Sequence, residues 1–89
     1  MENPLPKYLA FVKTAEKGSF TRAAQQLNYA QSSVSKMVAD LEQEWDMTLL
    51  ERSKSGVCLT SAGAAPMPFL RKILSDHREM EAQICRMNG

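Results

Sequence analysis

The chain has 89 residues, 44% of them hydrophobic and 24% charged, and a formal net charge of +1. The length suits one small folded domain, and the composition excludes a disordered tail. No apolar run approaches the roughly 20 residues of a membrane span, and the N-terminus lacks the segments of a signal peptide. The cysteines stand far apart and match no metal spacing. We therefore expect a reduced, cytoplasmic protein without a bound metal or cofactor.

Charge is distributed unevenly along the chain, although its sum is small. Residues 19–36 contain two basic side chains, Arg22 and Lys36, and no acidic ones. Residues 37–51 contain five acidic side chains and no basic ones, before Arg52 and Lys54 follow. This pattern predicts a polarised molecule in which one face approaches phosphate and another is repelled by it.

The first part of the chain predicts two amphipathic helices. Pro4 and Pro6 suit the start of the first helix, and Lys17-Gly18 ends it, because glycine readily adopts the left-handed conformation. Its apolar positions repeat at helical spacing: Leu5, Tyr8, Leu9, Val12 and Ala15. Ser19 is a favourable N-cap for a second, shorter helix. The apolar stripe of the second helix consists of Phe20, Ala23, Ala24 and Leu27.

A third helix is predicted from about Gln31 to Trp45, after a break at residues 28–30. Val34, Val38, Leu41 and Trp45 follow at i, i+4, i+7 and i+11, so they share the face toward the core. Polar side chains near the start lie on other faces, and acidic residues 40–46 are interpreted as a solvated face. Two helices joined by a turn of about three or four residues describe a helix-turn-helix.

A β-hairpin is predicted after the third helix. Residues 47–51 and 57–60 each alternate apolar and polar side chains over a short run. The basic, glycine-containing segment 52–56 between them predicts the turn. A hairpin that directly follows the second helix of a helix-turn-helix is a wing.

The segment from Thr60 onward is predicted to be mostly one helix. Pro66 and Pro68 predict either a late start near Pro66 or a kink in that turn. Further along, spacings of three and four alternate, which is the heptad pattern of helices that pair between chains. The positions of this seam are Leu70, Ile73, His77, Met80, Ile84 and Met87. His77 is expected to be partly buried in the seam rather than to bind a metal, because no second ligand lies nearby.

Together these elements predict a mainly α fold. Residues 1–60 form a winged helix-turn-helix, with three helices and a two-stranded β-hairpin wing. Residues 61–89 form a long C-terminal linker and dimerisation helix. We find no internal repeats, no glycine-rich phosphate loop and no spacing of nucleophile, histidine and acid that would support catalysis.

Four stretches of the sequence carry a family resemblance: "GSFTRAAQQL", "QSSVSKMVADLEQEW", "LLERS" and "LTSAG". In this combination and order they resemble the N-terminal DNA-binding domain of LysR-type transcriptional regulators. The resemblance covers most of the chain, from about Phe11 to Gly63. It implies a winged helix-turn-helix and a linker helix that pairs in a dimer. It also implies a C-terminal effector-binding domain, which is absent here, so the chain is interpreted as a fragment or a truncated protein.

The sequence departs from the family pattern at several positions. The family usually has serine in place of Ala30, and losing that N-cap costs about 1 kcal/mol unless Gln31 or Ser32 replaces it. The family usually has glycine in place of Asp46, but aspartate tolerates the left-handed conformation that we expect there. Leu50 replaces a common phenylalanine, and the two prolines of the linker helix are unusual.

The resemblance also indicates which residues contact DNA. On the recognition helix these are Gln31, Ser32, Ser33, Ser35 and Lys36. In the wing, Arg52 matches the family's arginine, and Lys54 extends the basic tip. Apart from the resemblance, Ser19, Thr21 and Arg22 are candidates for a phosphate contact, because the free amides at the start of the second helix favour an anion. Each group has a plainer interpretation: a solvated helix start, exposed charges on a turn, and a serine that only caps its helix.

We therefore expect a sequence-specific DNA-binding regulator of transcription that is not an enzyme. A homodimer would read an interrupted palindrome in double-stranded DNA, with the recognition helix in the major groove and the wing beside it. The alternative function is an interaction module that uses the heptad seam to pair with a full-length regulator. The resemblance assigns any small-molecule effector to the absent domain.

Overall fold

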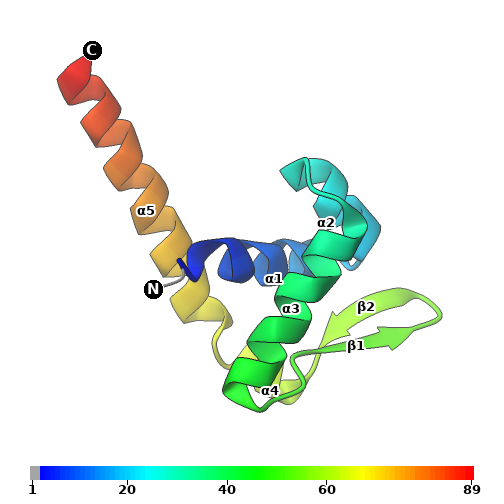
Figure 1. Ribbon diagram of the computed structural model, residues 1–89. Helices are drawn as coiled ribbons and strands as arrows, with labels where there is room; N and C mark the ends of the chain where they lie inside the picture. The colour runs from blue at the N-terminus through cyan, green and yellow to red at the C-terminus, as the bar shows by residue number, and fades with distance from the viewer. Residues whose placement is uncertain (1–2) are drawn as a thin grey trace.

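The computed structural model describes residues 3–89 (Figure 1). In chain order the elements are α1 (Leu5–Lys17), α2 (Phe20–Leu27), α3 (Gln31–Trp45), β1 (Leu50–Ser53), β2 (Gly56–Leu59), α4 (Ser61–Ala64) and α5 (Met67–Asn88). Figure 1 shows the hairpin on one side of the three-helix body and α5 extending away on the other side. This arrangement confirms the predicted mainly α fold with a winged helix-turn-helix and a long C-terminal helix.

The helices pack around one core that includes the residue just before the hairpin. Phe11 of α1, Val34 and Leu41 of α3, and Leu49 are fully buried. Ala23 of α2 is also fully buried, and its small side chain lets neighbouring helices approach closely. Trp45 lies at the edge of this core, where its ring centroid is 6.0 Å from that of Tyr8. The predicted stripe of α3 is therefore confirmed at its first three positions and is half-buried at the fourth.

The helix ends follow the sequence signals. Gly18 closes α1 in the left-handed conformation with φ 67°, and Ser19 caps α2 by accepting a hydrogen bond from the Arg22 amide at 3.2 Å. Asn28 closes α2 with φ 61°, and Asp46 closes α3 with φ 52°. Aspartate therefore adopts the expected left-handed conformation at the position where the family usually has glycine.

The predicted strand boundaries were wrong by a few residues. The first strand is Leu50–Ser53 rather than residues 47–51, and the turn is confined to Lys54 and Ser55. Residues 47–49 lie outside the four-residue strand. The Met47 amide donates to the Glu42 carbonyl at 3.0 Å, and the Leu49 carbonyl accepts from the Thr60 amide at 3.0 Å just beyond the last strand pair. Arg52 therefore lies within the strand, opposite Val57, and not in the turn.

The C-terminal segment contains a short helix, α4, and then the long helix α5. Pro66 is the N-cap residue of α5, so the late start was the correct one of the two alternatives. The Thr60 hydroxyl caps α4 by accepting from the Gly63 amide at 2.9 Å. Across residues 3–89, no helix combines the length and apolarity that a membrane crossing requires.

Candidate nucleic-acid interface

The start of α3 presents polar side chains to solvent. Gln31, Ser32, Ser33 and Lys36 are exposed, and Ser35 is half-buried. Val34, between them, is fully buried and fixes this turn against the core. Because the three serine side chains are short, a partner surface can approach this part of the helix closely. This surface therefore has the shape and chemistry that a recognition helix requires.

No side chain caps the start of α3. Ala30 is extended and lacks the hydroxyl, and neither Gln31 nor Ser32 replaces it. The Ala30 carbonyl accepts from the amides of Ser33 and Val34 at 3.1 and 3.2 Å, so the helix begins where the sequence predicted. The N-terminal amides of α3 thus lack the usual side-chain acceptor.

The start of α2 lies beside the start of α3. The Thr21 hydroxyl donates to Gln31 Oε1 at 3.2 Å, which joins the two helices through exposed side chains. Ser19 is half-buried as the N-cap, whereas Thr21 and Arg22 are exposed. The fold therefore brings these two groups of predicted contact residues together.

The wing brings a third group of predicted residues to the same region. The guanidinium carbon of Arg52 lies 4.7 Å from the centroid of the Phe20 ring, at the first position of α2. Lys54 is exposed in the two-residue turn. Arg52 thus lies close to the start of α2, while Lys54 extends the basic surface toward the hairpin tip.

Lys36 has a partner within its own helix. Its ammonium group lies 3.2 Å from Asp40 Oδ2, and the Lys36 side chain remains 76% exposed. An exposed pair of this kind is worth only a few tenths of a kcal/mol, about 0.3–0.5. Lys36 can therefore exchange Asp40 for a phosphate or a base at little cost.

The prediction that residues 40–46 form a solvated face is wrong at Glu42. Its Oε2 accepts hydrogen bonds from the amides of Leu49 and Leu50 at 2.7 and 3.3 Å. Glu42 is half-buried, with its carboxylate directed at the residues where the hairpin begins. No periodic or local sequence pattern predicted this contact, which joins α3 to the wing. Its neighbour Glu44 pairs with Lys7 at 3.3 Å.

The predicted seam on α5 is divided between two environments. Leu70 is only 3% exposed and packs into the core of its own chain, so it is not available at the surface. Ile73, Met80, Ile84 and Met87 are exposed by 42%, 52%, 48% and 78%. We call these four residues the α5 stripe. Phe69, 72% exposed, adds an apolar side chain that the heptad spacing missed.

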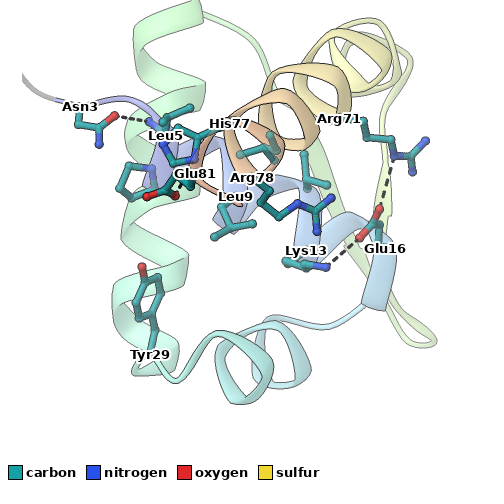
Figure 2. Close-up of a pocket in the computed structure, with 13 residues that line it drawn as sticks. Asn3, Leu5, Leu9, Lys13, Glu16, Tyr29, Arg71, His77, Arg78 and Glu81 are labelled. Atoms are coloured by element: carbon teal, nitrogen blue, oxygen red, sulfur yellow. Dashed lines mark hydrogen bonds and ion pairs between the residues drawn. The ribbon is translucent and has the colours of Figure 1, made fainter. Parts of the chain in front are cut away.

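A pocket of about 370 Å³ lies between α1 and residues 71–81 of α5, and Figure 2 shows the side chains that line it. Leu5, Leu9 and Leu74 supply apolar walls, and Tyr29 reaches it from the end of α2. His77 also lines the pocket and is half-buried, and its Nδ1 lies 3.2 Å from Glu81 Oε1 one turn later. Among residues 3–89, no three potential metal-ligating side chains gather.

The chain is similar to known proteins over almost its whole length. Residues 6–64 match the model of the bacterial regulatory helix-turn-helix proteins of the lysR family. An HTH-type transcriptional regulator of Azotobacter vinelandii, itself uncharacterised, is 39% identical over 80 residues, which are 90% of this chain and 56% of that protein.

Solved structures share the same fold. An H2O2-bound mutant of Corynebacterium glutamicum OxyR superposes with a TM-score of 0.93 at 31% identity, over 99% of this chain and 28% of that one. The BenM DBD in complex with catB site 1 DNA superposes with a TM-score of 0.86 at 34% identity, over 100% of this chain and 98% of that one. The chain thus spans only part of the Azotobacter and OxyR proteins. From the family match and these relatives, it belongs to the lysR family of bacterial regulatory helix-turn-helix proteins.

Proposed function

We propose that the chain binds double-stranded DNA sequence-specifically and regulates transcription. The observation that carries the proposal is the start of α3, where exposed polar side chains surround the fully buried Val34. The major groove of B-DNA admits an α-helix and presents donors and acceptors that such side chains can read. The solved complex of the BenM DBD, which shares this fold, supports the same role here.

Each polar residue at the start of α3 has a defined role in this proposal. Gln31 accepts from Thr21 through Oε1, so both hydrogens of its amide nitrogen can donate to acceptor atoms on a base edge, such as N7 of a purine. Ser32, Ser33 and Ser35 bond to bases or phosphates at close range. Lys36 binds a phosphate or guanine.

The wing and the start of α2 bind the sugar-phosphate backbone in this proposal. Arg52 and Lys54 supply positive charge from the hairpin. Ser19, Thr21 and Arg22 contact a phosphate at the start of α2, where helix amides and the macrodipole favour an anion. Such contacts fix the register of the protein on the duplex, while α3 reads the bases.

We further propose that two copies pair through α5 and read an interrupted palindrome. The α5 stripe is apolar, exposed and spaced as one helix face, which favours burial against a second copy. Paired domains read two half-sites related by the symmetry of the dimer. The protein would act in the cytoplasm, with no catalytic role.

The same stripe favours a second candidate function, pairing with a longer regulator of the family. In that case the chain would form mixed dimers and reduce DNA binding or activation by its partner. Co-expression with a tagged full-length relative, followed by purification through the tag, distinguishes mixed dimers from homodimers.

A fluorescence-anisotropy titration with labelled promoter fragments tests DNA binding. We expect a specific fragment to bind at least tenfold more tightly than a scrambled duplex of equal length. The logarithm of the binding constant should fall with the logarithm of salt concentration with a slope of about −3 to −4 per chain, from four basic contacts. Gln31→Ala should weaken binding to the specific fragment more than binding to the scrambled one. Binding without salt dependence, or unaffected by Gln31→Ala, would contradict the proposal.

A further inference from the structure

The hairpin is attached to the turn between α1 and α2, not only to its own chain neighbours. The Val57 amide donates to the Gly18 carbonyl at 3.0 Å. Gly56 lies so close that a Cβ atom there would be 2.6 Å from the same carbonyl oxygen, and its φ of 127° also favours glycine. Backbone contact therefore holds β2 beside Gly18, which immediately precedes the Ser19 N-cap of α2.

Arg52 lies opposite Val57 in the hairpin, so this attachment determines where Arg52 can reach. Its guanidinium carbon is 4.7 Å from the centroid of the Phe20 ring, within the range of a cation–π contact. Phe20 is 8% exposed, so its ring is held by the core, while Arg52 is exposed. The Phe20 ring is therefore held in place by the core, and the long side chain of Arg52 lies against it.

We propose that Phe20 is a positioning residue for DNA binding. It holds the guanidinium of Arg52 beside Ser19 and Thr21, so that the wing and the start of α2 bind the same stretch of sugar-phosphate backbone. A flexible arginine must lose side-chain entropy on binding a phosphate, and a guanidinium already stacked on an aromatic ring loses less. This inference rests on the proposed DNA binding. It assigns a binding role to a residue that the sequence placed only in the core.

The test compares Phe20→Leu with Phe20→Tyr. Leucine retains most of the buried volume but removes the ring, and tyrosine retains the ring. We expect Phe20→Leu to weaken specific DNA binding about fivefold, the effect of one cation–π contact, and Phe20→Tyr to stay within about twofold of wild type. Circular dichroism confirms that each variant is folded at the temperature of the titration.

A double-mutant cycle separates positioning from a general structural effect. In the Arg52→Ala background, Phe20→Leu should change the affinity less than about 1.5-fold, because no guanidinium remains to be positioned. An equal loss in both backgrounds, or no loss in the wild-type background, would overturn the inference.

A measurement without DNA keeps this inference distinct from the proposed function. In the free protein, the ring current of Phe20 should shift the Arg52 Cδ protons upfield in the NMR spectrum, and Phe20→Leu should abolish the shift. An absent shift in the wild-type protein overturns the positioning role even if DNA binds. If the shift is present but no duplex binds, the proposed function fails and with it the role of the contact in DNA binding.

Discussion

The start of α3 and the outer part of α5 are both exposed, but the first presents polar side chains with partners in the chain, whereas the second presents the apolar α5 stripe. Gln31 is bonded to Thr21, and Lys36 is paired with Asp40, so the polar surface is arranged by contacts within one chain. Met80 and Ile84 of the α5 stripe are about half exposed, and α5 extends away from the body (Figure 1). This difference supports the proposal that one chain forms the DNA-binding surface by itself, whereas the proposed burial of the stripe needs a second chain.

The largest expected effect is the loss of stability when a core side chain beneath α3 is shortened. Leu41 is fully buried under α3, so Leu41→Ala should lower the free energy of unfolding by about 3 kcal/mol through lost burial and a cavity. Chemical denaturation followed by circular dichroism measures this change. Gln43→Ala, an exposed position on the same helix, is the matched control and should change stability by less than about 0.5 kcal/mol. Equal stabilities for the two variants would contradict the assigned core.

The next largest effect is expected in the apolar α5 stripe. Ile84→Asp places a charge in the α5 stripe and should raise the dimer dissociation constant about tenfold or more, because a buried interface does not accommodate an unpaired carboxylate. Sedimentation equilibrium measures the constant. Ser75→Asp is the control, since Ser75 is exposed and lies about 180° around the helix from Ile84. A wild-type protein that stays monomeric at high concentration would contradict the proposed pairing through α5.

A smaller effect is expected from the ion pairs that both regions contain. Asp40→Asn releases Lys36 and removes a negative charge near the groove, so DNA affinity should rise about threefold at low salt and less at high salt. Lys72 and Asp76 of α5 form a similar pair at 3.0 Å, which makes Asp76→Asn the control. Anisotropy titrations should show no change for Asp76→Asn. The same gain in both variants would mean that charge alone, and not position, determines affinity.

The smallest expected effect concerns the start of α3. Ala30→Ser supplies the missing N-cap and should raise the free energy of unfolding by about 0.5 kcal/mol. Thermal denaturation should show a higher Tm than for Ala39→Ser, which places the same hydroxyl at an exposed position inside the helix. If Ala39→Ser gains as much, the hydroxyl does not act as a cap.

Local sequence signals predicted the helices and their ends well, because those depend on neighbouring residues. Ser19, Gly18 and Asp46 act at helix ends through their own backbone conformation or side chain, and each does so as predicted. The hairpin was predicted, but its first strand begins at Leu50 rather than at residue 47, beside the contact in which the Glu42 carboxylate accepts from the amides of Leu49 and Leu50. A contact across seven or eight residues leaves no periodic signal in the sequence.

The candidate surface was also predicted in part. The identities of Gln31, Lys36 and Arg52 followed from the family resemblance, but the contacts that arrange them required the fold. Thr21 meets Gln31 and Phe20 meets Arg52 only after α2, α3 and the hairpin pack together. The heptad pattern assigned Leu70 to a seam between chains, whereas it fills the core of its own chain. Periodicity identifies an apolar face but not the partner that buries it.

Two lysines with the same local pairing allow the most direct test of the central claim, that the start of α3 and not α5 contacts DNA. Lys36 and Lys72 each pair with an aspartate four residues later, and their side chains are 76% and 77% exposed. Anisotropy titrations of Lys36→Ala and Lys72→Ala on one specific duplex should show a loss of about tenfold, or ~1.4 kcal/mol, for Lys36→Ala. Lys72→Ala should bind within about 1.5-fold of wild type. Equal losses, or a larger loss for Lys72→Ala, would contradict this account of the interface.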